Sequence, residues 1–140
     1  MGPGPFSQKG VRPRFDFLAL QETMPKPTEI RLKKDARVIV ITFDDDSEFE
    51  YTFEYLRVHS PSAEVRGHSP GQETLQTGKN DVVVTRIDPV GHYAVRFVFD
   101  DGHDTGLYDW QYLYNLGRDM DANWLRYLDR LEAEGYPREK

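Results

Sequence analysis

Alternation of apolar and polar residues constrains the fold of this chain more than any other feature of its sequence. Residues 37–43 (RVIVITF) are apolar on both faces and rich in β-branched side chains, which is typical of a central strand. The polar residues 44–47 have the chemistry of a turn. Residues 48–53 then place aromatic side chains on one face and polar side chains on the other. This pattern predicts a β-hairpin, preceded by a weaker alternation at residues 29–33.

A second pair of strands is expected further along the chain. Residues 81–87 (DVVVTRI) and 92–99 (HYAVRFVF) flank a turn-like Asp-Pro-Val-Gly sequence at 88–91. After this pair, Gly102 can supply the positive φ of a tight turn, and residues 105–108 can return as a short strand.

Two helices are predicted near the C-terminus. The first covers residues 109–116 and is ended by Gly117. The second begins at the N-cap Asp121 and ends at Gly135. Its apolar stripe comprises Trp124, Leu125, Leu128 and Leu131. Because such a stripe needs a sheet to cover, the sequence predicts an α+β fold, a two-layer sandwich in which C-terminal helices cover a mainly antiparallel sheet.

The chain divides into three parts. Residues 1–27 hold five of the nine prolines, and we expect a disordered or loosely packed arm there. Residues 28–117 are expected to form the domain, and residues 118–140 an amphipathic helix packed on it. The total of 140 residues suits one domain.

Composition excludes several classes of site. The chain has no cysteine, which rules out disulfides, thiolate metal sites and cysteine nucleophiles. Since it shows neither a long apolar run nor a signal peptide, we expect a cytoplasmic protein that does not enter the membrane. The formal net charge of −6 divides into +4 over residues 1–37 and −10 over the remainder. An acidic body repels phosphate backbones, so we expect no nucleic-acid partner.

Candidate chemistry is concentrated between residues 59 and 104. Residues 59–80 predict a long loop, and such loops are often functional. Residues 100–104 (DDGHD) place three carboxylates around one imidazole, a donor set that suits iron, manganese or zinc. The sequence contains no phosphate-binding loop, no nucleophile elbow and no His-x-Asp/Glu pair typical of iron dioxygenases. We therefore expect no catalysis by this chain alone.

Two segments closely resemble the gamma-butyrobetaine hydroxylase-like N-terminal domain family. They are YLRVHSPSAEVRGHSP at residues 55–70 and VGHYAVRFVFDDGHDTGLYDWQYLYNLG at residues 90–117. The resemblance covers residues 28–117 and implies a small module of sheet and helices. In bacteria such domains look like stand-alone proteins of undetermined function. Related copies are fused to P-loop iron–sulfur carriers or precede the catalytic domain of carnitine-pathway dioxygenases.

In those dioxygenases the module holds a zinc ion through three cysteines and one histidine. The resemblance places Ser60, Ser62 and Val65 at the cysteine positions and His103 at the histidine position. Because one ligand of four is retained, we expect no tight tetrahedral zinc site, and apolar burial in its place. The alternative is a weaker nitrogen and oxygen site for a divalent metal, iron or zinc. Its candidate ligands are His103, Asp101, His59 and His68.

Three functions remain open at this point. The first is a non-catalytic protein-interaction or accessory module, which the resemblance links to iron–sulfur or dioxygenase systems, with an unidentified protein as partner. Its expected contact residues are Arg57, Ser60, Ser62, Arg66 and Trp110. The second is a metal-binding protein centred on His103. The third is an accessory subunit of a separate dioxygenase chain.

Overall fold

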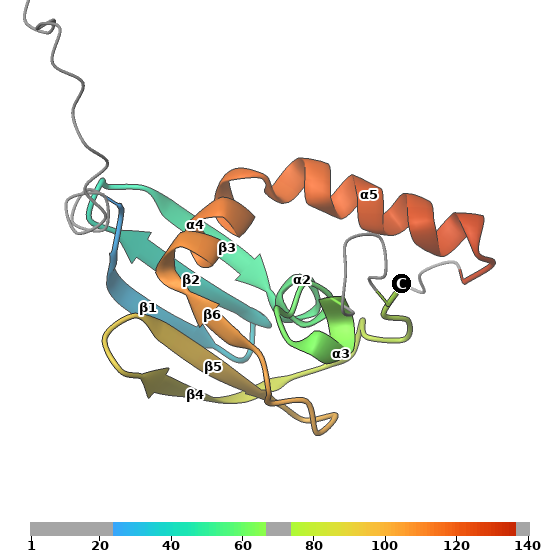
Figure 1. Cartoon of the computed structure of the whole chain (residues 1–140), viewed down its shortest axis with the longest axis horizontal. Coiled ribbons are helices and arrows are strands. Elements are labelled where there is room, and N and C mark those ends of the chain that lie inside the picture. Colours follow the sequence, from blue (N-terminus) through green and yellow to red (C-terminus); the bar gives the residue numbers. More distant parts are fainter. Residues whose placement is uncertain (1–23, 67–73, 137–140) are drawn as a thin grey trace, which may run out of the picture.

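The computed structural model describes residues 24–66 and 74–136. Along the chain, two groups of three strands come before the long C-terminal helix (Figure 1). The strands are β1 (Pro27–Lys33), β2 (Val38–Phe43), β3 (Glu48–Thr52), β4 (Val84–Val90), β5 (Ala94–Phe99) and β6 (Leu107–Asp109). The helices are α2 (Phe53–Val58), α3 (Ala63–Arg66), α4 (Trp110–Arg118) and α5 (Met120–Ala133).

The strands form two antiparallel sheets of three strands each, in the orders β1-β2-β3 and β4-β5-β6. This confirms the predicted α+β class. The predicted hairpin is also confirmed, since Ile39 pairs with Tyr51 and Ile41 with Phe49 across β2 and β3. In the second sheet, β4 extends three residues beyond the predicted end at residue 87. Pro89 is tolerated there because β4 lies at the edge of its sheet, and the turn falls instead at Gly91, whose φ is +56°.

The inward faces of both sheets share one hydrophobic core with α2 and α4. Three buried tyrosines join its parts by donating hydrogen bonds to backbone carbonyls. Tyr51 donates to Leu113 O (2.7 Å), Tyr55 to Leu116 O (2.6 Å) and Tyr108 to Leu56 O (2.6 Å). The helices α2 and α4 are therefore fixed to the strands by satisfied polar contacts as well as by apolar packing.

The C-terminal helix α5 packs on α2 rather than over a sheet. Its contact surface is a second cluster in which Tyr127 and Leu131 meet Val58, with Leu75, Trp124 and Leu128 around them. Figure 1 shows α5 passing α2 along one side of the molecule. The predicted stripe was wrong at Leu125, whose side chain is 61% exposed. Tyr127 is buried on this helix instead. Its ring packs in the second cluster, and its hydroxyl donates a hydrogen bond to Glu54 (2.8 Å).

Two predicted helix ends also need correction. The N-cap of α5 is Asp119, so Asp121 lies in the first turn, where its charge suits the helix dipole. Gly117 does not end α4, which continues to Arg118. A Cβ at Gly117 would collide with the Phe49 ring, so this glycine allows close packing of α4 on β3. Gly135, with φ +80°, follows the end of α5 as predicted. No helix in the described residues is long and apolar enough to cross a membrane.

Candidate functional site

The candidate site is built on α2, a short helix whose six residues are all buried. It begins because the Thr52 side chain accepts the Tyr55 amide (3.0 Å), which satisfies one free N–H of the first turn. After Val58 the chain turns through His59 and carries Ser60 and Ser62 into the interior, where they are 1% and 7% exposed. The helix thus positions Arg57 and the two serines on the side that faces the β5–β6 turn.

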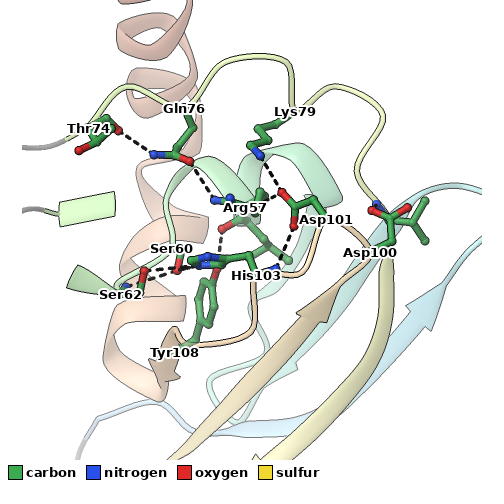
Figure 2. A network of polar contacts seen from close by, with 12 residues as sticks. Arg57, Ser60, Ser62, Thr74, Gln76, Lys79, Asp100, Asp101, His103 and Tyr108 are labelled. Atoms are coloured by element: carbon green, nitrogen blue, oxygen red, sulfur yellow. Dashed lines mark hydrogen bonds and ion pairs between the residues drawn. The ribbon is translucent and has the colours of Figure 1, made fainter. Parts of the chain in front are cut away.

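His103 meets these serines from that turn (Figure 2). Its Nε2 lies 2.8 Å from Ser60 Oγ and 3.4 Å from Ser62 Oγ, and the residue is 6% exposed. Ser60 Oγ also accepts the Ser62 amide at 3.3 Å. We call Ser60, Ser62 and His103 the serine–histidine cluster. Its hydrogen bonds join residues more than 40 positions apart in the sequence.

The turn that presents His103 is fixed by its own backbone. Gly102 adopts φ +90°, a conformation that favours glycine, and the His103 carbonyl accepts the Phe99 amide at 3.0 Å. Asp101 Oδ1 accepts the His103 amide at 3.2 Å. The aspartate therefore shapes the turn through the backbone amide of His103.

The other carboxylate oxygen of Asp101 holds two cations. Oδ2 lies 2.9 Å from Arg57 Nε and 2.7 Å from Lys79 Nζ (Figure 2). Arg57 in turn donates from Nη1 to Gln76 Oε1 at 3.1 Å. Burial opposes ionisation of Asp101, but hydrogen bonds from Lys79, His103 N and Arg57 outweigh it and lower the pKa of this carboxyl to about 2. This ion network ties the segment after residue 74 to the β5–β6 turn.

The residues present do not fit the zinc ion that the family resemblance implies. Ser60 and Ser62 offer neutral hydroxyls, which are poor zinc ligands at neutral pH, and Val65 offers no donor. His103 Nε2 is engaged by Ser60, and Asp101 is engaged by two cations. Within residues 24–66 and 74–136, no three or more His, Asp or Glu side chains are arranged to hold a metal ion.

Among the other predicted metal ligands, the structure describes His59. His59 points its Nδ1 to the Tyr55 carbonyl (3.0 Å), and its ring lies against the Tyr55 ring, with the ring centres 4.6 Å apart and the planes tilted by 50°. Burial lowers the pKa of this imidazole. His68 lies outside the described residues.

The predicted contact residues divide into buried and surface groups. Arg57, Ser60 and Ser62 are at most 7% exposed, so their side chains do not lie at the surface. Their polar groups form hydrogen bonds inside the molecule. Arg66 is exposed, with its guanidinium 4.9 Å from the centre of the Tyr112 ring. Trp110 is half-buried at the start of α4.

Sequence reasoning missed several members of this site. Lys79 and Gln76 join it only because the chain after residue 74 folds back, which no local pattern reveals. Gly106 was also missed, although a Cβ there would collide with Ser60 Oγ and lie 3.1 Å from Pro61 Cδ. A glycine inside the predicted short strand at residues 105–108 was the available signal for this close approach.

Comparisons with known proteins show what this chain is similar to. Residues 30–114 match the family model described as gamma-butyrobetaine hydroxylase-like, N-terminal. One structure solved by NMR in solution is 45% identical, covers 93% of this chain and 92% of its own, and superposes with a TM-score of 0.72. A second NMR structure is 39% identical over 84% of this chain and 94% of its own, with a TM-score of 0.71.

A crystal structure of a protein of unknown function from Acidithiobacillus ferrooxidans, which belongs to the DUF971 family, is also similar. It is 41% identical over 65% of this chain and 91% of its own, with a TM-score of 0.56. No curated protein matches the chain.

Proposed function

Because this chain belongs to the gamma-butyrobetaine hydroxylase-like N-terminal family, we propose that it is a non-catalytic interaction module that serves an iron–sulfur or dioxygenase system. The link to those systems comes from the family resemblance. The interaction role rests on the burial of the serine–histidine cluster and on exposed apolar residues in and beside the second sheet.

The observation that carries the proposal is the burial of the serine–histidine cluster. Ser60 and His103, at 2.8 Å, have the spacing of a nucleophile and its base. A reacting pair must also be reached by substrate, yet Ser60 is 1% and His103 6% exposed. Their hydrogen bonds therefore stabilise the fold, and function is left to exposed residues.

Two of the four exposed large hydrophobic residues among those described are Tyr93 (56%), in the β4–β5 turn, and Leu107 (46%), on β6. Trp110 lies against the same turn, because its amide and its Nε1 donate to Tyr93 O (3.2 Å) and His92 O (2.8 Å). Leu107 is only three residues away on the edge strand β6. We call Tyr93, Leu107 and Trp110 the β5–β6 surface. Exposed large apolar side chains are common at protein contacts.

Charged residues on the neighbouring strands suggest the chemistry of the partner. Leu107 pairs with Arg96, and Arg96 and Arg86 share the single carboxylate of Asp88. Both arginine side chains are substantially exposed, at 41% and 64%. Two guanidinium groups against one carboxylate favour a partner protein with apolar contact residues next to an acidic group.

The alternative of a metal-binding protein centred on His103 gains no support from these contacts, since its nitrogen and the nearby carboxylate both have protein partners. An accessory subunit of a dioxygenase is one form of the proposed module. Identifying the partner protein would distinguish a dioxygenase subunit from a protein of iron–sulfur assembly.

The test is affinity capture from the native host followed by binding with the purified partner. We expect Tyr93→Ser/Leu107→Ser to lose the partner, while Leu125→Ser/Tyr136→Ser, which removes the other two exposed hydrophobics, retains it. Equal binding by both double variants, or a captured protein that fails to bind when purified, would show that this surface is not the interface.

A further inference from the structure

A cavity at the start of α2 has no role in the module proposed above. It encloses about 420 Å³, within the range of small-molecule sites. It lies where the β1–β2 turn, the start of α2 and the start of α5 meet. Its walls include Phe53, Tyr55 and Trp124, so an aromatic or aliphatic group would find apolar contacts there. Other lining residues are Ala36, Arg37, Thr52, Glu54, Asn80, Met120 and Asp121.

Arg37 supplies a fixed positive charge to this cavity. Its Nη2 donates to Val82 O at 2.7 Å, and its guanidinium lies 5.8 Å from the centre of the Phe53 ring. Neither contact neutralises the charge, and Arg37 forms no ion pair with any carboxylate in the described part of the chain. Lys33 and Lys34, in or beside the same turn, are exposed. The turn is therefore basic in a protein whose net charge is −6.

The backbone at Arg37 indicates that this side chain has a role. Its φ is +61°, in the left-handed region that glycine or asparagine adopts most readily. The turn itself needs only backbone contacts, since Arg37 N donates to Lys34 O and Arg37 O accepts the Phe53 amide. Strained non-glycine residues of this kind are concentrated at ligand sites.

The acidic residues of the cavity limit the charge of its ligand. Glu54 is buried and accepts the Tyr127 hydroxyl, and Asp121 is exposed in the first turn of α5. Both would repel a doubly charged phosphate more than a singly charged carboxylate. A carboxylate also matches the planar fork of a guanidinium.

We propose that this cavity binds a small carboxylic acid, with its carboxylate on Arg37 and its aromatic or aliphatic body against Phe53 and Trp124. The inference does not depend on the β5–β6 surface, which involves different residues. Fragment-sized acids are expected to bind with a Kd on the order of 1 mM.

The test is an amide NMR titration of the full chain with 3-phenylpropionate, its uncharged amide and phenyl phosphate. We expect saturable shifts at residues 36–37, 53–55 and 120–124 with the carboxylate, and shifts at least tenfold weaker with the amide. Arg37→Gln should weaken binding about tenfold, a loss of about 1.4 kcal/mol. Lys34→Gln, in the same turn, should change it less than twofold.

The same spectra report whether Arg37→Gln is folded, and Arg37→Lys, which keeps the charge, should retain part of the affinity. Three results would overturn the inference: equal shifts with acid and amide, tighter binding of phenyl phosphate than of the carboxylate, or no saturable shift with the acid.

Discussion

Ser60 Oγ and His103 Nε2 lie 2.8 Å apart although 43 residues separate them in the sequence. The family resemblance assigns both positions to a zinc site, and the structure brings them together without any thiolate. A hydrogen-bonded cluster thus joins the end of α2 to the β5–β6 turn. The following predictions test what this cluster and its neighbours contribute.

Ser60→Ala removes the hydroxyl that satisfies His103 Nε2. Because the imidazole is then left buried without this partner, we expect a loss of about 1–3 kcal/mol in the free energy of unfolding. Urea denaturation measures it. Thr77→Ala, at an exposed position, is the control and should stay within about 0.5 kcal/mol of the parent. A Ser60→Ala variant as stable as the control would mean that the cluster contributes little.

Asp101→Asn removes the carboxylate that pairs with Arg57 and Lys79. The folded pKa of Asp101, about 2, is below its unfolded value of about 3.8, so its stabilisation is complete above pH 4 and is lost as the pH falls toward 2. The side chain is 23% exposed, and solvent screening limits the effect to on the order of 1 kcal/mol.

Stability measured between pH 2 and 7 isolates this contribution as the difference between the parent and Asp101→Asn. That difference should shrink below pH 4. The matched variant Asp104→Asn, in the same turn, should run parallel to the parent. A difference that is constant over the whole range would contradict the assigned pKa.

Gly106→Ala places a methyl group against Ser60 Oγ and the Pro61 ring. Since both belong to a buried segment that cannot move freely, we expect a loss of about 1–3 kcal/mol, measured by thermal denaturation. Thr105→Ala, at the exposed neighbouring position, should be nearly neutral. If Gly106→Ala were equally neutral, the close approach of β6 to Ser60 would be in doubt.

Ser60→Cys/Ser62→Cys/Val65→Cys restores the thiols that the resemblance places around His103. If the geometry of a zinc module is retained, this variant should bind Co²⁺ one to one with the visible spectrum of a tetrahedral thiolate site. Adding His103→Ala should weaken that binding at least tenfold. Absence of the spectrum in the triple variant would show that the backbone has diverged from the zinc-binding arrangement.

The alternation of side chains in the sequence predicted where strands occur, but not how the strands divide between two sheets. The β2–β3 hairpin follows from side-chain alternation, which the pleat imposes on any half-buried strand. The division into two sheets depends on core packing between distant segments, which periodicity does not encode. Leu125 was misassigned because hydrophobicity alone cannot distinguish it from Tyr127, which is buried with a partner for its hydroxyl.

The site was predictable only in part, for a similar reason. Family resemblance located Ser60, Ser62 and His103 correctly as neighbours, whereas the Asp101 pairs with Arg57 and Lys79 span 44 and 22 residues. Such ion pairs depend on the path of the chain between them. His59 was grouped with His103 by residue type, but its ring faces the Tyr55 carbonyl.

The central claim is that hydrogen bonds and apolar burial, without a metal ion, hold the cluster around His103. Thermal unfolding of tag-free protein before and after prolonged treatment with a strong chelator, with metal content measured on the same samples, tests it most directly. The two melting curves should superpose, with far less than one metal ion per chain. A stoichiometric metal whose removal lowers the Tm or abolishes cooperative unfolding would contradict the claim.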